Sequence, residues 1–190
     1  CPATAYDAKG LLKAAIRDDN PVLMFEHKLL YGAKGARAES GSLDASSEIP
    51  PDDYIVPIGK GIVRRDGKDV TIVATLLMMH RALAAAEQLA AEGISAEVID
   101  PRSLVPFDWD LVGASVRKTN RLVVVTEGPK TGSVASEIAA TAAETQIDYL
   151  AAPIYRVTSP DIPVPFSPAM EEYYRPSVPR ICKAAREVMG

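Results

Sequence analysis

The residues best suited to chemistry lie at an acidic helix end near the start of the chain. Residues 15–21 read AIRDDNP, and the preceding helix must end by Asn20, because Pro21 disfavours the α conformation in the residue before it. The last carbonyl groups of a helix lack intrahelical partners and carry the negative end of its dipole. With the side-chain oxygens of Asp18 and Asn20, they present hard ligands to a monovalent or divalent cation. A solvated acidic helix end explains the same residues, and on these residues alone it is the favoured interpretation.

The two histidines offer acid–base chemistry, but the sequence does not fix their partners. His27 follows Glu26, and the pair fits either an acid–base couple or a structural contact. His80 falls in the first turn of a predicted helix, near the sheet edge where open α/β folds bind ligands. Glu127, after a strand, and Glu137, within a helix, fit a salt bridge as well as a site. Ser/His/Asp and Cys/His sets are not evident, so no residue is assigned a catalytic role.

A glycine-rich turn, GPKTGS at residues 128–133, lies between a predicted strand and a predicted helix. A helix N-terminus behind such a turn can hold phosphate through free N–H groups and its dipole. The turn matches neither G-x-x-x-x-G-K-[ST] nor G-x-G-x-x-G. We therefore favour a tight turn in which Thr131 or Ser133 caps the helix.

A strand–helix–strand unit between residues 69 and 108 organises the fold. Residues 70–73 and 96–99 are short β-branched runs of strand length. Between them apolar residues recur at helical spacing, and Gly93 supplies the helix stop. Such a crossover builds a parallel sheet covered by helices. The apolar face of the helix is expected to contain Met79, Leu83, Ala86 and Ala90. Further helices are expected at 108–120, at 134–144 and at the C-terminus, and further strands at 121–127 and 154–159.

The first fifty residues have a different pattern. Thr4 and Asp7 form a capping box at the start of a helix, and residues 21–27 predict a buried strand. One helix and one strand cannot bury a core alone, so they indicate the tail of a larger domain. Residues 28–57 lack periodicity and predict an inter-domain linker, with a boundary near residue 52 and a candidate edge strand at 54–58. The buried face of the first helix is expected to contain Leu11, Leu12, Ala15 and Ile16.

Charge and composition exclude several classes of partner. A net charge of −4 argues against nucleic acid or an anionic membrane, because both require clustered Lys and Arg. The sequence contains no apolar run near the ~20 residues that span a bilayer. Cys1 and Cys182 form no metal-binding or redox motif and predict two reduced thiols of a cytosolic protein.

Five stretches of the sequence resemble, in order, the β subunit of the E1 component of 2-oxo acid dehydrogenase complexes, the pyruvate, branched-chain and acetoin dehydrogenase group. They are PATAYDAKGLLKAAIRDDNPVLMFEHKLLYG, YIVPIGKGIVRRDGKDVTIVA, AEVIDPRSLVPFD, SVRKTNRLVVVTEG and TGSVASEIAA. The resemblance covers essentially the whole chain and the C-terminal part of the family's subunit. It implies a three-layer α/β/α sandwich of the transketolase C-terminal-domain type over residues 53–190. Residues 1–52 would be the C-terminal tail of a truncated pyrimidine-binding domain plus a linker.

The resemblance also implies an activity and its cofactors. In the family, thiamine diphosphate attacks the 2-oxo acid, carbon dioxide leaves, and the acyl group passes to a lipoyl arm on the E2 component. The activating glutamate and the active-site histidine of the β subunit lie ahead of the part that this chain resembles. The diphosphate and magnesium motif lies in the α subunit. Thiamine diphosphate and Mg are therefore expected only in the full enzyme, and this chain alone is expected to bind no thiamine diphosphate and to be inactive.

The family's potassium site changes the weight given to the acidic helix end. Its ligands resemble Ala15, Ile16, Asp18 and Asn20, which would coordinate K⁺ mostly through carbonyl oxygens. The resemblance thus favours the cation interpretation in the intact subunit, with one further ligand from the upstream segment. The stretch ATLLMMHR departs from the family pattern, which often has a tyrosine or glycine before this helix.

The partners implied are the E1 α subunit, a second β subunit and the peripheral subunit-binding domain of E2. The expected location is the cytoplasm, or the mitochondrial matrix in a eukaryote. A non-catalytic assembly module on the same fold is the main alternative. Another thiamine enzyme, such as a transketolase or deoxyxylulose phosphate synthase, is a further one.

Overall fold

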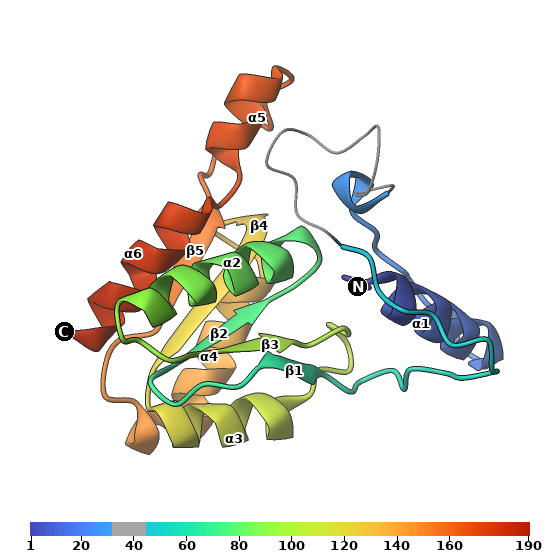
Figure 1. The fold of residues 1–190 in the computed structure, drawn as a ribbon, viewed down its shortest axis with the longest axis horizontal. Helices are drawn as coiled ribbons and strands as arrows, with labels where there is room; N and C mark the ends of the chain where they lie inside the picture. The colour runs from blue at the N-terminus through green and yellow to red at the C-terminus, as the bar shows by residue number, and fades with distance from the viewer. Residues whose placement is uncertain (32–44) are drawn as a thin grey trace.

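A five-stranded sheet forms the centre of the computed structural model (Figure 1), in the strand order β1–β3–β2–β4–β5. The structure describes residues 1–31 and 45–190. The strands are β1 (Ile62–Arg65), β2 (Val70–Ala74), β3 (Ala96–Asp100), β4 (Leu122–Pro129) and β5 (Tyr155–Ser159). β3, β2, β4 and β5 run parallel, whereas β1 pairs with β3 in the antiparallel sense. The predicted mostly parallel sheet is confirmed.

The antiparallel edge strand begins later than the sequence predicts. Residues 54–58, the candidate edge strand, form no strand and lead into a turn, where the N–H of Lys60 donates to the carbonyl of Pro57 (3.3 Å). Gly59 adopts a φ of +85° in this turn, a left-handed conformation that costs little only for glycine. Pairing with β3 therefore starts only at Ile62, after the chain has left the turn.

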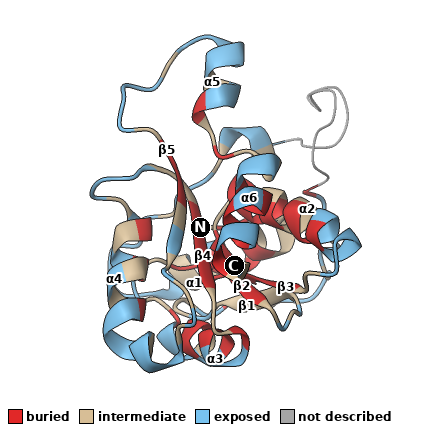
Figure 2. Cartoon of the chain, turned by 90° about the vertical axis from the view of Figure 1, so that its left-hand side faces the viewer, coloured by how far each residue is buried: buried red, intermediate tan, exposed pale blue. Residues whose placement is uncertain are grey.

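Helices cover both faces of the sheet and complete the three layers (Figure 2). One face carries α2 (Leu77–Ala91) and α6 (Val178–Met189), and the other carries α3 (Trp109–Thr119) and α4 (Val134–Gln146). Successive residues of β2 point to opposite faces, so Ile72 packs in the α2/α6 core and Val73 in the α3/α4 core. The α/β/α sandwich predicted for this part of the chain is confirmed.

The helix ends follow local rules, with two differences from prediction. Gly93 ends α2 with a φ of +84°, as expected, but Ala90 is exposed and the buried face of α2 is centred on Ala82, Ala86 and Leu89. Ser133 occupies the N-cap position of α4 without a side-chain capping bond. Of the turn predicted at 128–133, residues 130–133 form the bend that leads directly into α4, whereas residues 128 and 129 are the last residues of β4.

Beyond β5 the proline-rich segment contains a short helix, α5 (Pro168–Tyr174), that stands clear of the sandwich (Figure 1). Phe166 ahead of this helix, and Met170 and Tyr173 within it, are exposed. Within the described ranges, no helix has the length and apolar run needed to cross a membrane.

The N-terminal segment lies beside the sandwich and outside its sheet (Figure 1). The predicted cap of α1 (Ala5–Arg17) is confirmed, because Thr4 Oγ1 accepts from the N–H of Asp7 at 3.2 Å. The predicted buried face is wrong in part: Leu11 is buried, but Leu12 is 50% exposed and Ile16 is 75% exposed. A single side of α1 faces the rest of the chain, where Gly10 allows the backbone to approach Val56 closely.

The predicted buried strand at 21–27 is also wrong. These residues form no strand, and Leu23 is 82% exposed. A strand needs a neighbour for its N–H and C=O groups, and none of the described strands runs beside this segment. Apolar composition alone therefore does not create a strand here.

The end of the predicted linker is bound to α1. The hydroxyl of Ser47 accepts from the N–H of Tyr6 at 2.8 Å, and the Lys9 ammonium donates to the carbonyl of Pro50 at 2.6 Å. The rings of Tyr6 and Tyr54 stack with centroids 4.5 Å apart. This return of the chain places residues 47–54 along the helix. Residues 32–44, the rest of the linker's centre, lie outside the described residues.

The ion pair at the far end of α1 gives a pH prediction. Lys13 and Arg17 both donate to Asp53, and these contacts lower the pKa of Asp53 to about 2 from the ordinary 3.8. The contribution of this contact to stability is then present above pH 3.8 and is lost as the pH falls towards about 2. We expect NMR of the Asp53 carboxyl carbon to show this low midpoint. A midpoint at 3.8 or above would contradict the contact.

Candidate functional site

The carboxyl edge of the sheet opens between β2 and β4. The chain passes from β2 through α2 to β3 on one side, and from β3 through α3 to β4 on the other. Such a switch in strand order leaves a crevice beyond the carboxyl ends, where open α/β folds bind ligands. A cavity of about 240 Å³ lies at this place. Its walls are mainly apolar residues from the ends of β2 and β4 and the starts of α2 and α4, among them Ala74, Leu77, Val125, Ala135 and Ile138.

A histidine–glutamate pair borders this cavity. Nε2 of His27 lies 2.8 Å from Oε2 of Glu127. Nδ1 of His27 accepts from the N–H of Leu29 at 3.2 Å, so in the neutral ring the proton is on Nε2 and is donated to Glu127. Oε1 of Glu127 is buried without a hydrogen-bond partner among the described residues. The Glu127 carboxylate therefore has one buried oxygen whose hydrogen-bonding capacity is unused among the described residues.

The interpretations of both histidines are changed by this geometry. His27 does not pair with Glu26, which accepts instead from the hydroxyl of Tyr31. The partner of His27 is 100 residues away in the sequence, so inspection of neighbouring residues could not identify it. His80 is buried, and its Nε2 lies 2.7 Å from the carbonyl of Ala3. That contact ties the N-terminal segment to α2 and makes His80 a structural residue.

The backbone is strained at the same edge. Leu76, which lines the cavity and precedes α2, has φ 54° and ψ −131°. Few residues other than glycine adopt such a conformation, and it costs about 1–3 kcal/mol. The family resemblance predicted a glycine or tyrosine as common before this helix, and a glycine would adopt this backbone without strain.

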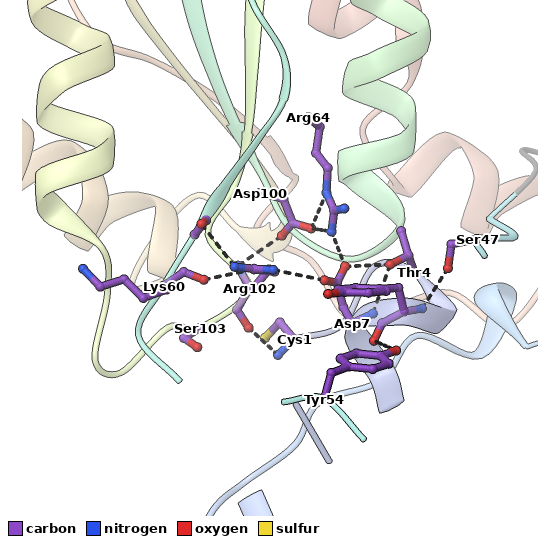
Figure 3. A network of polar contacts seen from close by, with 12 residues as sticks. Cys1, Thr4, Asp7, Ser47, Tyr54, Lys60, Arg64, Asp100, Arg102 and Ser103 are labelled. Atoms are coloured by element: carbon purple, nitrogen blue, oxygen red, sulfur yellow. Dashed lines mark hydrogen bonds and ion pairs between the residues drawn. The ribbon is translucent and has the colours of Figure 1, made fainter. Parts of the chain in front are cut away.

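A buried network of four charged side chains joins α1 to the carboxyl edge of β3 (Figure 3). Asp7 and Asp100 have no exposed surface, and both accept from Arg64, with 2.8 Å from Nη2 to Oδ2 of Asp100. Nη1 of Arg102 reaches Asp7 Oδ1 at 3.3 Å. Burial raises the pKa of Asp100, while the neighbouring Arg64 opposes that rise. Two carboxylates facing two guanidinium groups leave no uncompensated charge in this contact.

The rest of the network fixes Arg102. Its Nε donates to the carbonyl of Lys60 at 2.9 Å, and its Nη2 donates to the carbonyl of Gly61 at 3.2 Å. Its backbone N–H donates to Asp100 at 3.1 Å, with φ at +57°. Sequence reasoning missed this network. The available signal was the sequence Asp100-Pro101-Arg102, which places two charges directly at the end of a fully buried strand.

The four predicted cation ligands lie together at the end of α1. The N–H of Asp18 donates to the carbonyl of Ala15 at 3.4 Å. Oδ1 of Asp18 accepts from the backbone N–H and the side-chain amide of Asn20, at 2.9 and 3.0 Å, and these bonds lower the pKa of Asp18. Ile16 contributes its carbonyl to the same helix end. The donor chemistry suits a cation such as K⁺, and the assignment stays a prediction.

Glu137 belongs to no metal-binding cluster, and the other acidic residues that the structure describes form none either. No three His, Cys, Asp or Glu side chains within residues 1–31 and 45–190 are placed to share a metal ion. This absence concerns side-chain ligands, so it does not bear on a cation site built from backbone carbonyl groups, such as the one predicted at the end of α1. Cys182 is buried and Cys1 half-buried, and both are free thiols.

The chain is an α/β/α sandwich with a largely apolar cavity at the carboxyl edge of its sheet. Residues 59–181 match the family model "Transketolase, C-terminal domain", which is more than half of the chain. The chain therefore belongs to the transketolase C-terminal domain family. A solved structure titled "Split gene transketolase, inactive beta4 tetramer" is 32% identical, with a TM-score of 0.63, over 76% of this chain and 47% of that one.

Full-length relatives extend the similarity beyond that domain to essentially the whole chain. The acetoin:2,6-dichlorophenolindophenol oxidoreductase subunit beta of Bacillus subtilis is 45% identical over 100% of this chain and 52% of its own length. The 2-oxoisovalerate dehydrogenase subunit beta of the same organism is 45% identical, over 98% and 54%. The mitochondrial pyruvate dehydrogenase E1 component subunit beta of Caenorhabditis elegans is 45% identical, over 100% and 52%. The chain thus resembles E1 β subunits and spans about half the length of these relatives.

Proposed function

We propose that this chain is the C-terminal part of the E1 β subunit of a 2-oxo acid dehydrogenase. The complete enzyme of this class decarboxylates a 2-oxo acid with thiamine diphosphate and passes the acyl group to the lipoyl group of E2. One observation carries the proposal: the identity extends along the whole chain, including residues 1–58, which precede the matched domain. An unrelated module that had merely recruited the fold would be expected to match only within the domain.

The contacts to the cofactor are assigned to other parts of the enzyme. Thiamine diphosphate, with Mg on its diphosphate, supplies the carbanion that attacks the 2-oxo acid when it is bound. By the family resemblance, the residues that bind the diphosphate and Mg lie on the α subunit, and the activating glutamate lies in the β-subunit segment ahead of the part that this chain resembles. The role of this chain is to support neighbouring domains and to form subunit contacts, in the cytoplasm or in the mitochondrial matrix.

Potassium is the ion that we propose for the end of α1. The carbonyls of Ala15 and Ile16 lie at the negative end of the helix dipole, and Asp18 supplies a carboxylate whose pKa is lowered. Asn20 restrains that carboxylate through two hydrogen bonds. In the intact subunit a bound K⁺ would fix the helix end and the extended segment that follows it.

Exposed apolar side chains supply surfaces for assembly. Leu23 and Phe25 are exposed on the N-terminal segment, and Val105 is 90% exposed on the loop after β3. Phe166 is fully exposed ahead of α5. Large exposed apolar patches usually become covered by partners. The partners proposed are the E1 α subunit, a second β subunit and the peripheral subunit-binding domain of E2.

A chimeric subunit tests the proposal. Residues 1–190 would replace the aligned half of the Bacillus subtilis 2-oxoisovalerate dehydrogenase subunit beta, co-produced with its α subunit. We expect decarboxylation of 2-oxo acids to be retained, with the substrate preference of the retained front half. A control chimera would carry the corresponding half of the C. elegans pyruvate dehydrogenase subunit. An active control beside an inactive test chimera of correct size would favour the assembly module instead.

The chain alone is expected to bind no thiamine diphosphate. Calorimetric titration with thiamine diphosphate and Mg should release no binding heat with the chain, because the diphosphate and aminopyrimidine contacts lie on other segments. The active chimeric enzyme serves as the positive control. Tight binding to the isolated chain would contradict this division of roles.

A further inference from the structure

A second cavity, unrelated to the β2/β4 edge, lies beside the outermost strand β5. It has a volume of about 410 Å³ and is bounded by β5, the segment after it, the start of α6 and the turn after β4. Ser159 is the last residue of β5 and pairs in register with Pro129 at the end of β4. The cavity therefore also extends beyond the carboxyl edge of the sheet, on the outer side of β5. Its volume is within the range of small-molecule sites, about 300–1,000 Å³.

Positive charge is concentrated in this cavity. Four cationic side chains line it against a single carboxylate, that of Asp161. The chain as a whole has a net charge of −4, so the cavity is a local exception. The four cationic residues come from the turn after β4, from β5 and from α6: Lys130, Arg156, Arg180 and Lys183.

The two arginines are held in place. Nη1 of Arg156 donates to the carbonyl of Lys130 at 3.0 Å and to the hydroxyl of Ser136 at 2.7 Å. Nη2 of Arg180 donates to the carbonyl of Thr158. Each guanidinium has five N–H donors, so both retain donors for a ligand. Fixing a side chain before binding reduces the entropy lost on binding.

The single carboxylate in the cavity is already engaged. Oδ1 and Oδ2 of Asp161 accept from the N–H and the hydroxyl of Thr131, at 3.0 and 2.8 Å. Its negative charge is thus stabilised by the turn after β4. A buried hydroxyl is present at the same place: Ser159 is 1% exposed, and its Oγ has no hydrogen-bond partner within the described residues.

We propose that this cavity binds the phosphoryl group of a small phosphorylated molecule. A phosphate at neutral pH carries a charge of about −1.5 to −2 and three acceptor oxygens. Arginine forks and lysine ammonium groups match both properties. An added β-strand from a partner protein is disfavoured, because Arg180 already occupies the Thr158 carbonyl on this strand. The inference does not depend on the proposed E1 function.

Heteronuclear NMR on the full chain tests the site with inorganic phosphate and pyrophosphate as probes. We expect saturable shifts of the amides of Thr131, Ser159 and Asp161, with pyrophosphate binding more tightly. Arg180→Gln is expected to weaken phosphate binding at least about tenfold, since it removes a charge-assisted hydrogen bond. Lys183 is exposed, and its nearest acid lies 3.7 Å away, so Lys183→Gln is expected to weaken binding about two- to fivefold without affecting folding.

Arg186→Gln is the matched control, because Arg186 is on the same helix but pairs with Glu92 away from the cavity. Its phosphate affinity should equal that of the unaltered chain. Citrate at equal ionic strength distinguishes phosphate from carboxylate recognition, and it should bind more weakly. Equal shifts with chloride, or equal losses in all three variants, would overturn the proposal. So would unchanged binding in both Arg180→Gln and Lys183→Gln.

Discussion

Asp7→Asn is expected to release the N-terminal segment from the sandwich. Asp7 is fully buried and faces both Arg64 and Arg102, so the amide would leave two guanidinium groups opposite one carboxylate. Removing one partner from a buried ion pair typically costs about 3–5 kcal/mol. We expect the docking of α1 to weaken by about this amount. Limited trypsin digestion should then cut within α1, at Lys9, Lys13 and Arg17, much faster than in the unaltered chain.

Asp53→Asn is the control for this experiment. Asp53 also binds two cationic residues of α1, but its pair is exposed to solvent, where ion pairs contribute little. Cleavage within α1 should rise far less than in Asp7→Asn. Equal rates for the two variants would show that burial of the Asp7 network does not hold the segment.

Ile72→Ala is expected to lower the free energy of unfolding by about 2–5 kcal/mol, as for other buried large-to-small changes. Ile72 has no exposed surface and lies on β2, the middle strand of the sheet. Its removal leaves a hole between the sheet and α2, which the surrounding backbone cannot close. Urea unfolding followed by circular dichroism measures the change.

Leu23→Ala provides the comparison, because Leu23 is 82% exposed. The same kind of truncation should leave the urea midpoint almost unchanged. A loss as large as that of Ile72→Ala would instead support the buried strand predicted at 21–27. The two variants together therefore separate the sequence interpretation from the structure.

The sandwich was predictable because its signals are local. Runs such as residues 70–73 and 96–99 carry strand composition, and Gly93 marks a helix end, so the parallel unit follows from spacing alone. The resemblance to E1 β subunits gave the same layers independently. The antiparallel edge strand was misplaced because it starts only after a turn at Gly59. That turn is set by the positive φ of Gly59, a backbone conformation that residue composition does not reveal.

The candidate site was less predictable because its contacts are long-range. His27 meets Glu127 across 100 residues, and Arg64 meets Asp7 across 57. A sequence shows each residue beside its chain neighbours, which is why Glu26 was the predicted partner of His27. The segment 21–27 was misjudged for a related reason, since burial requires a partner surface as well as apolar side chains.

The central claim is that α1 docks through polar contacts onto a sandwich that has its own core. Native-state hydrogen exchange tests it most directly, on the full chain with and without Asp7→Asn. We predict that α1 amides exchange through a local opening of lower free energy than that of β2 and β4. Asp7→Asn should accelerate α1 exchange by about 10²–10³-fold and leave the strands unchanged. A common opening free energy for α1 and the strands, raised or lowered together by Asp7→Asn, would contradict the account.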